Sequence, residues 1–341
     1  MQKEKRKNWS ITTNERLEKD GRSHSDQPLM LQPSSDTTIS VRMPIQRSDT
    51  HSAMQTAEIT VLPKFPKRHS EGHKGTFGKV LLWAGSLGMT GAAILAGRAA
   101  LRGGAGLVYV ATPRCCTTVV ACGEASYLTV PLPDDGDART DSAALDVLLE
   151  KISSMDAVAM GPGLGQSSAL SDLVLQLYQQ TPLPCVVDAD ALNALATQPD
   201  KMTDHAGPRI LTPHVGEFAR LTGFAADYIS ANRVDCAMEF AARHRVIVIL
   251  KGPGTVVTDG HGYYINKTGN PGMATGGTGD VLTGLILALL GQGCRPFEAA
   301  QLGVYLHGLA GDVAAREWTQ PGLIASDLPD YLPRAIASHL A

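Results

Sequence analysis

From about residue 61 onward, short runs of apolar residues alternate with stretches in which apolar residues recur every three or four positions. The apolar runs predict buried strands and the periodic stretches predict helices. The predicted strands are Lys79–Ala84, Leu107–Ala111, Asp156–Met160, Pro184–Asp188, Arg209–Thr212 and Arg245–Leu250, followed by a hairpin of Thr255–Thr258 and Tyr263–Ile265. The predicted helices are Met89–Arg102, Ser168–Gln179, Ala231–Arg243, Thr278–Leu290, Phe297–Ala315 and Ser326–His339.

Continuous apolar strands that alternate with helices are typical of a mostly parallel sheet covered on both faces. Because such crossovers are right-handed, this order predicts one three-layer α/β/α domain over residues 61–341. Ligands of such a fold bind beyond the carboxyl ends of the strands. Several polar or glycine-rich segments fall at these ends, namely Gly85-Ser86, Gly161–Gly165, Asp188–Asp190, Pro213-His214 and Lys251-Gly252.

The first sixty residues differ from the rest, because they are rich in charged and small polar residues and have no apolar period. Such a segment buries too little surface to offset its ordering entropy, so residues 1–60 are expected to be a disordered tail. The tail has no apolar stretch of signal-peptide length. Its acidic residues, among them Glu15 and Asp20, also argue against an organelle transit peptide.

Composition narrows the class of partner. The 341 residues are 43% hydrophobic and carry a net charge of −3, which gives no reason to expect nucleic acid or an anionic membrane as a partner. The six cysteines form no C-x-x-C pair and no cluster with zinc spacing. They are expected to be small buried apolar residues in a reducing compartment, the cytoplasm.

The most informative segment is Asn270–Asp280, a glycine-rich loop that runs into the apolar helix Val281–Leu290. Glycines let backbone N–H groups turn toward one point, and a helix N-terminus adds partial positive charge. Together they predict a site for a phosphate or for a phosphoryl group in transfer. Asp280 at its rim is placed to take a proton from a hydroxyl.

Three other segments have both a ligand-binding and a purely structural interpretation. His73–Gly78 is either a basic lip over a phosphate-bearing ligand or an ordinary turn into a strand. Gly85-Ser86 and Gly91–Ala93 offer either ligand contact or close packing of a helix on the sheet. Gly161–Gly165 indicates either close approach of the backbone to a ligand or a structural turn.

The remaining polar positions are also open to two interpretations. His214 and Glu217 share a face at a helix start. In one interpretation, one of the two residues binds ligand and the other holds Mg²⁺ through water. In the other, Glu217 is simply an acidic residue of the first helical turn. Lys251–Thr255 holds nucleotide phosphates or ribose, or merely closes a hairpin. Asp188 and Asp190 approach a metal or phosphate, or cap the short helix Ala191–Leu195.

In this order, the segments resemble the NAD(P)H-hydrate dehydratases of the ribokinase-like superfamily. The resemblance covers about residues 61–340 and rests on His73–Gly78, Gly161–Leu164, Leu211–Glu217 and Ala274–Asp280. These enzymes repair nicotinamide cofactors whose ring has taken up water. ADP in most bacterial members, or ATP in eukaryotic ones, phosphorylates the ring hydroxyl, and loss of phosphate restores NADH or NADPH.

The resemblance implies a role for each matching residue. Ala92, Gly163, His214 and Asp280 would contact the hydrated cofactor, with Asp280 as the base. The amides of Gly277, Thr278 and Gly279 would form an anion hole. The nucleotide would be bound by Lys251, Gly252, Pro253, Gly254, Thr255 and Gly279. Mg²⁺ would bridge the nucleotide phosphates near Glu217, through water.

Relatives often carry an epimerase domain before this one, and the first sixty residues are far too short for it, so the dehydratase alone is expected. ADP is favoured over ATP, and relatives imply a homotetramer. Two alternatives stay open. The first is a kinase of the same fold that phosphorylates a vitamin precursor or a sugar, although sugar kinases commonly have Asn where His214 stands. The second is a non-catalytic nucleotide sensor.

Overall fold

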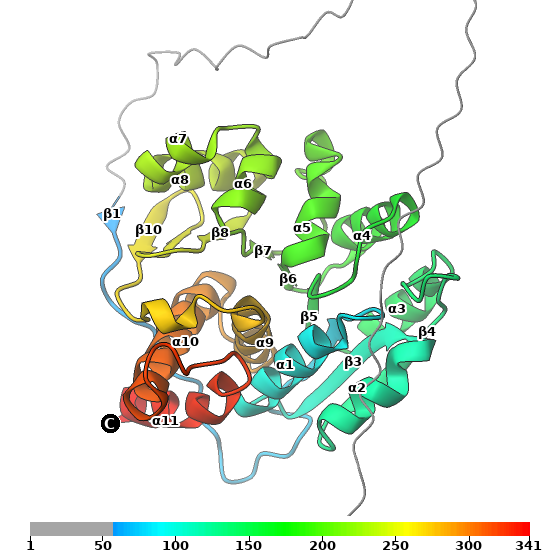
Figure 1. Ribbon diagram of the computed structural model, residues 1–341, viewed down its shortest axis with the longest axis horizontal. Helices are drawn as coiled ribbons and strands as arrows, with labels where there is room; N and C mark the ends of the chain where they lie inside the picture. Colours follow the sequence, from blue (N-terminus) through cyan, green and yellow to red (C-terminus); the bar gives the residue numbers. More distant parts are fainter. Residues whose placement is uncertain (1–56) are drawn as a thin grey trace, which may run out of the picture. The chain divides into compact units, whose positions relative to one another are not determined.

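The computed structural model describes residues 57–341. The polar tail expected over residues 1–60 therefore lies mostly outside the described residues. Residues 57–341 build a ten-stranded sheet with helices on both faces, in the order β1-β10-β9-β8-β7-β6-β5-β2-β3-β4 (Figure 1). Within this part, β9 is antiparallel to both neighbours and the other pairs are parallel.

The strands are short. They are β1 (Ala57–Glu58), β2 (Lys79–Trp83), β3 (Leu107–Pro113), β4 (Leu128–Leu132), β5 (Ala157–Met160), β6 (Cys185–Val187), β7 (Arg209–Leu211), β8 (Ile247–Leu250), β9 (Val256–Thr258) and β10 (Gly262–Ile265). One helical layer contains α1 (Thr90–Arg102), α2 (Thr117–Gly123), α9 (Thr278–Gly291), α10 (Pro296–Trp318) and α11 (Leu328–Leu340). The other contains α3 (Ala144–Ile152), α4 (Ser168–Gln180), α5 (Ala189–Ala196), α6 (Val215–Thr222), α7 (Ala226–Ala231) and α8 (Arg233–His244).

The central strand β2 shows why the sequence forms three layers. Successive side chains of a strand point to opposite faces. Val80 and Leu82 enter the core beneath α1 and α9, whereas Leu81 and Trp83 enter the core on the other face. All four side chains are at most 1% exposed. Each such burial is worth about 1.5–3 kcal/mol, so a strand that is apolar on both sides is stable only between two helical layers.

Helix α9 is the element that brings the glycine-rich loop to the sheet. It packs against α1 so closely that a methyl group on Gly284 would lie 2.0 Å from the carbonyl oxygen of Ala96. Its residues from Val281 to Leu290 are buried. The helix is therefore fixed along its whole length, and its N-terminus lies at the carboxyl edge of the strands.

The predicted strands and long helices are confirmed, with ends that differ by a few residues. The sequence did not reveal β1, β4, α2, α3 and α7. Strand β4 lies at the edge of the sheet, is half-exposed and contains Pro131, so it lacks the continuous apolar pattern of the inner strands. Within residues 57–341, no helix is long and apolar enough to cross a membrane.

Candidate active site

The loop before α9 is held from behind by polar and apolar contacts. Asp312 accepts hydrogen bonds from the amide of Gly269 (2.9 Å) and from the Asn270 side chain (3.0 Å). Asn270 in turn caps the short turn Pro271–Met273 through the amide of Gly272. Gly277 has a φ of 94° and backs onto α1, which is close enough that a methyl group there would lie 2.5 Å from the Leu95 side chain. The loop is therefore preorganised.

The amides at the end of this loop and at the start of α9 are largely unused. Within residues 57–341, the N–H groups of Gly276, Gly277, Gly279 and Asp280 have no hydrogen-bond acceptor. The amide of Thr278 reaches only Thr275 O, at 3.5 Å. Amides of a first helical turn must find partners outside the helix. Free amides clustered at a helix N-terminus are the arrangement that binds anions in other proteins. The anion site that the sequence predicts at residues 277–279 stays a prediction.

Asp280 stands in the first turn of α9, beside these amides. Burial, followed by the negative charge of Asp188, raises the pKa of Asp280 to about 7, although the Lys251 ammonium pulls it back. Asp190 and Glu217 add smaller contributions in the same upward direction. A carboxyl that gains and loses its proton near neutral pH is suited to act as a general base or acid.

A buried ion pair lies beneath the first turn of α9. Lys251 at the end of β8 places its Nζ 2.9 Å from Asp188, and the Thr283 hydroxyl donates to the other oxygen of Asp188 at 2.7 Å. Burial alone would raise the pKa of Asp188, but the Lys251 charge and the hydrogen bonds outweigh it and hold this pKa below its usual range. A methyl group on Gly279 would lie 3.3 Å from Nζ, so the glycine leaves room for the ammonium.

His214 and Glu217 form a capping box at the start of α6. His214 Nδ1 accepts from the amides of Gly216 and Glu217, and the Glu217 carboxylate accepts from the His214 amide at 2.8 Å. Glu217 also lies 3.8 Å from Lys251 Nζ. Its side chain is 7% exposed, whereas that of His214 is 54% exposed and open to a ligand.

The opposite wall of the site is built by α1 and the loop after β5. Ser86 donates to Gly163 O at 2.9 Å, and a methyl group on Gly163 would lie 3.0 Å from the Ala92 side chain. The structure thus brings Ala92 and Gly163 together. The close approach at Gly161 is to the protein itself, because a methyl group there would lie 1.8 Å from Asp188 O. The structural interpretation therefore holds at that glycine.

The segment Lys251–Thr255 connects β8 to the antiparallel β9, so it does close a hairpin. The Thr255 hydroxyl donates to Gly252 O at 2.9 Å, and Gly252 has a φ of 141°. Lys251 also donates its amide to Pro213 O, which joins this loop to the one that carries His214. The two loops therefore lie side by side at the carboxyl edge.

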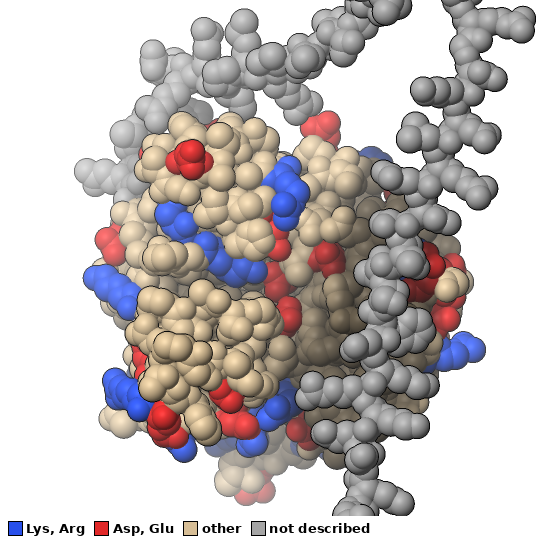
Figure 2. Space-filling view, viewed as in Figure 1, with Lys and Arg blue, Asp and Glu red and all other residues tan. Residues whose placement is uncertain are grey.

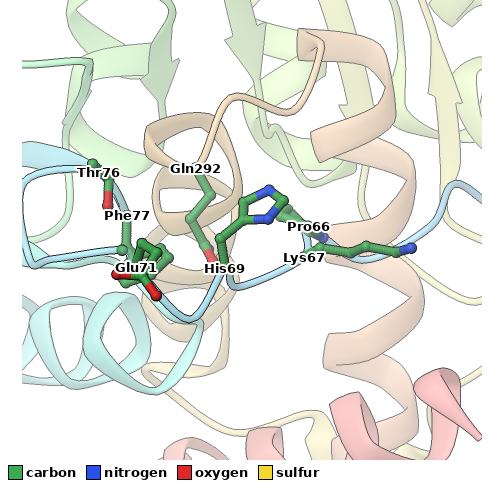
Figure 3. Close-up of a pocket in the computed structure, with 8 residues that line it drawn as sticks. Pro66, Lys67, His69, Glu71, Thr76, Phe77 and Gln292 are labelled. Atoms are coloured by element: carbon green, nitrogen blue, oxygen red, sulfur yellow. The ribbon is translucent and has the colours of Figure 1, made fainter.

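His73–Gly78 lies elsewhere. Gly78 packs on Gly291 at the far end of α9, and a methyl group on Gly106 would lie 1.9 Å from Lys74 O. The segment is thus an ordinary turn at the amino edge of the sheet, away from Asp280 in the same chain. A cavity of about 380 Å³ lies beside it, and Figure 3 shows Gln292 and His69 at its wall.

Three other carboxylates, those of Asp188, Asp190 and Glu217, lie close enough to Asp280 to raise its pKa. Figure 2 shows acidic side chains gathered beside a hollow near the middle of the face drawn there. Neither the cavity next to Gln292 nor a second one of about 200 Å³ beside β1 and β10 includes Asp280 or Lys251. Within residues 57–341, no three acidic, histidine or cysteine side chains converge as metal ligands.

Comparisons with known proteins agree with this geometry. A family model described as NAD(P)H-hydrate dehydratase matches residues 80–334. The chain is 48% identical over 272 residues to a bifunctional NAD(P)H-hydrate repair enzyme of Moorella thermoacetica, covering 79% of this chain and 51% of that protein. It is 38% identical over 280 residues to an ADP-dependent (S)-NAD(P)H-hydrate dehydratase of Bacillus subtilis, covering 81% and 95%. The chain therefore spans about half the length of the bifunctional relatives that it matches.

A solved structure adds to this agreement. The ADP/ATP-dependent NAD(P)H-hydrate dehydratase from Bacillus subtilis, co-crystallised with ATP and Mg²⁺, matches with a TM-score of 0.69 and 32% identity, over 81% of this chain and 95% of that one. A hydroxyethylthiazole kinase from Pyrococcus horikoshii, at 17% identity and a TM-score of 0.55, shares the fold alone.

Proposed function

The chain belongs to the NAD(P)H-hydrate dehydratase family, and on this premise we propose that it restores NADH or NADPH from the hydrated cofactor at the expense of an adenine nucleotide. Asp280 takes the proton of the ring hydroxyl, whose oxygen attacks the terminal phosphoryl group of the nucleotide. The ring carbon–oxygen bond then breaks to release the phosphate, the neighbouring ring carbon loses a proton, and the double bond re-forms between the two carbons. The net change with ADP is hydrated cofactor plus ADP to reduced cofactor, AMP, phosphate and a proton.

One observation carries the proposal, namely a carboxyl of pKa about 7 beside a row of unpaired amides. The amides of Gly277, Thr278 and Gly279 stabilise the charge that develops on the transferring phosphoryl group. Asp280 lies in the first turn of the helix that begins at this loop, so the proposed base and the amides belong to one segment. We further assign Ala92, Gly163 and His214 to the hydrated cofactor and residues 251–255 with Gly279 to the nucleotide.

We propose that Mg²⁺ binds chiefly through the nucleotide phosphates, where it offsets their negative charge. The protein offers little direct coordination. Both oxygens of Glu217 face its own helix start or Lys251, so this residue reaches a cation only through water. ADP is the nucleotide we favour. We further propose that the protein is a homotetramer in the cytoplasm. Light scattering of the purified protein tests this assembly.

The proposal is tested by incubating the full chain with hydrated NADH and either ADP or ATP. The reduced-ring absorbance returns if the protein is a dehydratase. A small-molecule kinase of this fold would instead leave a stable phosphate ester, detected by mass spectrometry, and a sensor would bind nucleotide without turnover. A flat absorbance trace with both nucleotides contradicts the proposal.

A further inference from the structure

Arg233 is the first residue of α8, and its side chain reaches back to the loop after β8. Its Nη2 donates to Leu250 O at 2.7 Å. A methyl group on Gly252 would lie 3.1 Å from Nη1, so the guanidinium lies directly against the glycine turn of residues 251–255. Nothing in the sequence marked this arginine, because it lies eighteen positions before Lys251, in a different element.

The charge of Arg233 is uncompensated. Among the described residues no carboxylate forms an ion pair with it, and its Nε is buried without a hydrogen-bond partner. Burial lowers the pKa of Arg233, and no acidic neighbour opposes this. The residue also stands at the N-terminus of a 12-residue helix, which is the positive end of its dipole. A half-buried cation in this place destabilises the protein unless an anion binds it.

Lys251 cannot supply the missing charge. Its ammonium lies 2.9 Å from Asp188 and 3.8 Å from Glu217, so two carboxylates already face it. The glycine turn of residues 251–255 therefore has a neutralised cation on one side. On the other side is a guanidinium that no carboxylate of residues 57–341 pairs with. A guanidinium presents a rigid fork of donors that matches phosphate oxygens.

We propose that Arg233 is a nucleotide-binding residue that contacts the anionic phosphate chain. The inference rests on the proposed function for the identity of the anion, an adenosine phosphate. If Arg233 contacts the phosphates, its contribution to binding should increase with the negative charge of the ligand. An arginine that only anchored the loop through Leu250 O would affect the nucleoside and its phosphates equally.

The experiment is calorimetric titration of the full chain with adenosine, AMP, ADP and ATP, for wild type and Arg233→Gln. We expect adenosine affinity to change by less than about twofold and ADP affinity to fall by about tenfold or more, as for loss of a charge-assisted contact. Arg233→Lys keeps the charge without the fork of donors, so its ADP affinity should lie between those of wild type and Arg233→Gln. Arg243→Gln is the matched control, since Arg243 is on the same helix but already pairs with Glu239.

Two results overturn the inference. One is an equal loss for adenosine and ADP, which assigns Arg233 to anchoring the loop. The other is ADP binding that is unchanged in a folded Arg233→Gln, or absent from wild type. If Arg233→Gln does not fold, Arg233→Lys decides, because loss of the fork of donors should weaken ADP binding and leave adenosine binding unchanged. Failure of the proposed function is separate: wild type would bind ADP but leave hydrated NADH unchanged.

Discussion

Glycines stand at both ends of α9, but the two ends have opposite properties. At its C-terminal end, Gly291 packs against Gly78, and the Gln292 side chain donates to Gly103 O and Ala288 O. At its N-terminal end, the amides of Gly276, Gly277, Gly279 and Asp280 have no acceptor within residues 57–341, and Asp280 lies among buried charges. Glycine-rich segments therefore mark a ligand site only where donors are left unused.

Two pairs of glycines show a similar contrast, whereas Gly161 and Gly277 at the carboxyl edge also pack on the protein itself. At the amino edge, a methyl group on Gly106 or Gly78 would strike backbone atoms of the protein at 1.9 and 2.4 Å. At the carboxyl edge, a methyl group on Gly276 or Gly91 would meet no atom within 4 Å. The first pair allows the chain to pack on itself, whereas the second pair leaves space where a ligand could lie.

The largest expected effect comes from the acid at the carboxyl edge. Asp280→Asn should lower turnover of the hydrated cofactor by about 10²- to 10⁴-fold, because a positioned base contributes that much. ADP binding should persist, since the amides remain. Asp156→Asn is the control, because Asp156 accepts from the Lys79 amide at the amino edge. Steady-state kinetics on both variants would refute the assignment if Asp280→Asn turned over like wild type.

The next effect concerns the ion pair beneath α9. Lys251→Met leaves Asp188 buried without its counter-ion, and the free energy of unfolding should fall by about 3–5 kcal/mol. The double variant with Asp188→Asn should recover part of this loss, because the uncompensated charge is then gone. Urea unfolding measures all of these variants. Additive losses in the double variant would mean that the two residues do not stabilise each other.

Glycine substitutions compare the two edges directly. Gly106→Ala should lower the free energy of unfolding by about 1–3 kcal/mol, the usual cost of overpacking, without changing ADP affinity in the folded protein. Gly276→Ala should leave stability nearly unchanged. It should instead weaken ADP binding if ligand occupies the space above the loop. Thermal unfolding measures the stability of both variants, and calorimetry measures their ADP affinity. If Gly276→Ala lowered stability and Gly106→Ala weakened ADP binding, the distinction between the two edges would be contradicted.

The sequence revealed what is local. The inner strands and α9 were predictable, because continuous apolar runs leave few alternatives, whereas the half-exposed β4 was not. The amides of residues 277–279 and Asp280 are consecutive, so one segment disclosed them. Asp188, Lys251 and Thr283 were harder, since they are separated by 63 and 95 positions and meet only through the sheet. The role proposed for Arg233 could not be predicted from the residues next to it in the sequence. It depends on the lack of a carboxylate partner in the fold, which only the structure shows.

A further effect is a change in the pH dependence of stability, which also separates the two edges. The pKa of Asp280 is raised from 3.8 to about 7, so the folded state holds its proton more tightly than the unfolded state between these values. Ionising it therefore costs stability, and its contribution falls as pH rises, by up to about 1.4 kcal/mol per pH unit.

Buried histidines act in the opposite direction. Burial lowers the pKa of His307 to about 4, so its contribution to stability rises with pH over part of the same range. The informative quantity is thus the difference between wild type and Asp280→Asn, measured by urea unfolding from pH 4 to 7. Asp280→Asn should therefore become steadily more stable relative to wild type as pH rises from 4 to 7. Gly106→Ala, far from the buried acids, should shift the wild-type curve by a constant amount. A constant offset for Asp280→Asn would instead mean that the Asp280 carboxyl titrates normally, and the chemical contrast between the two ends of α9 would be lost.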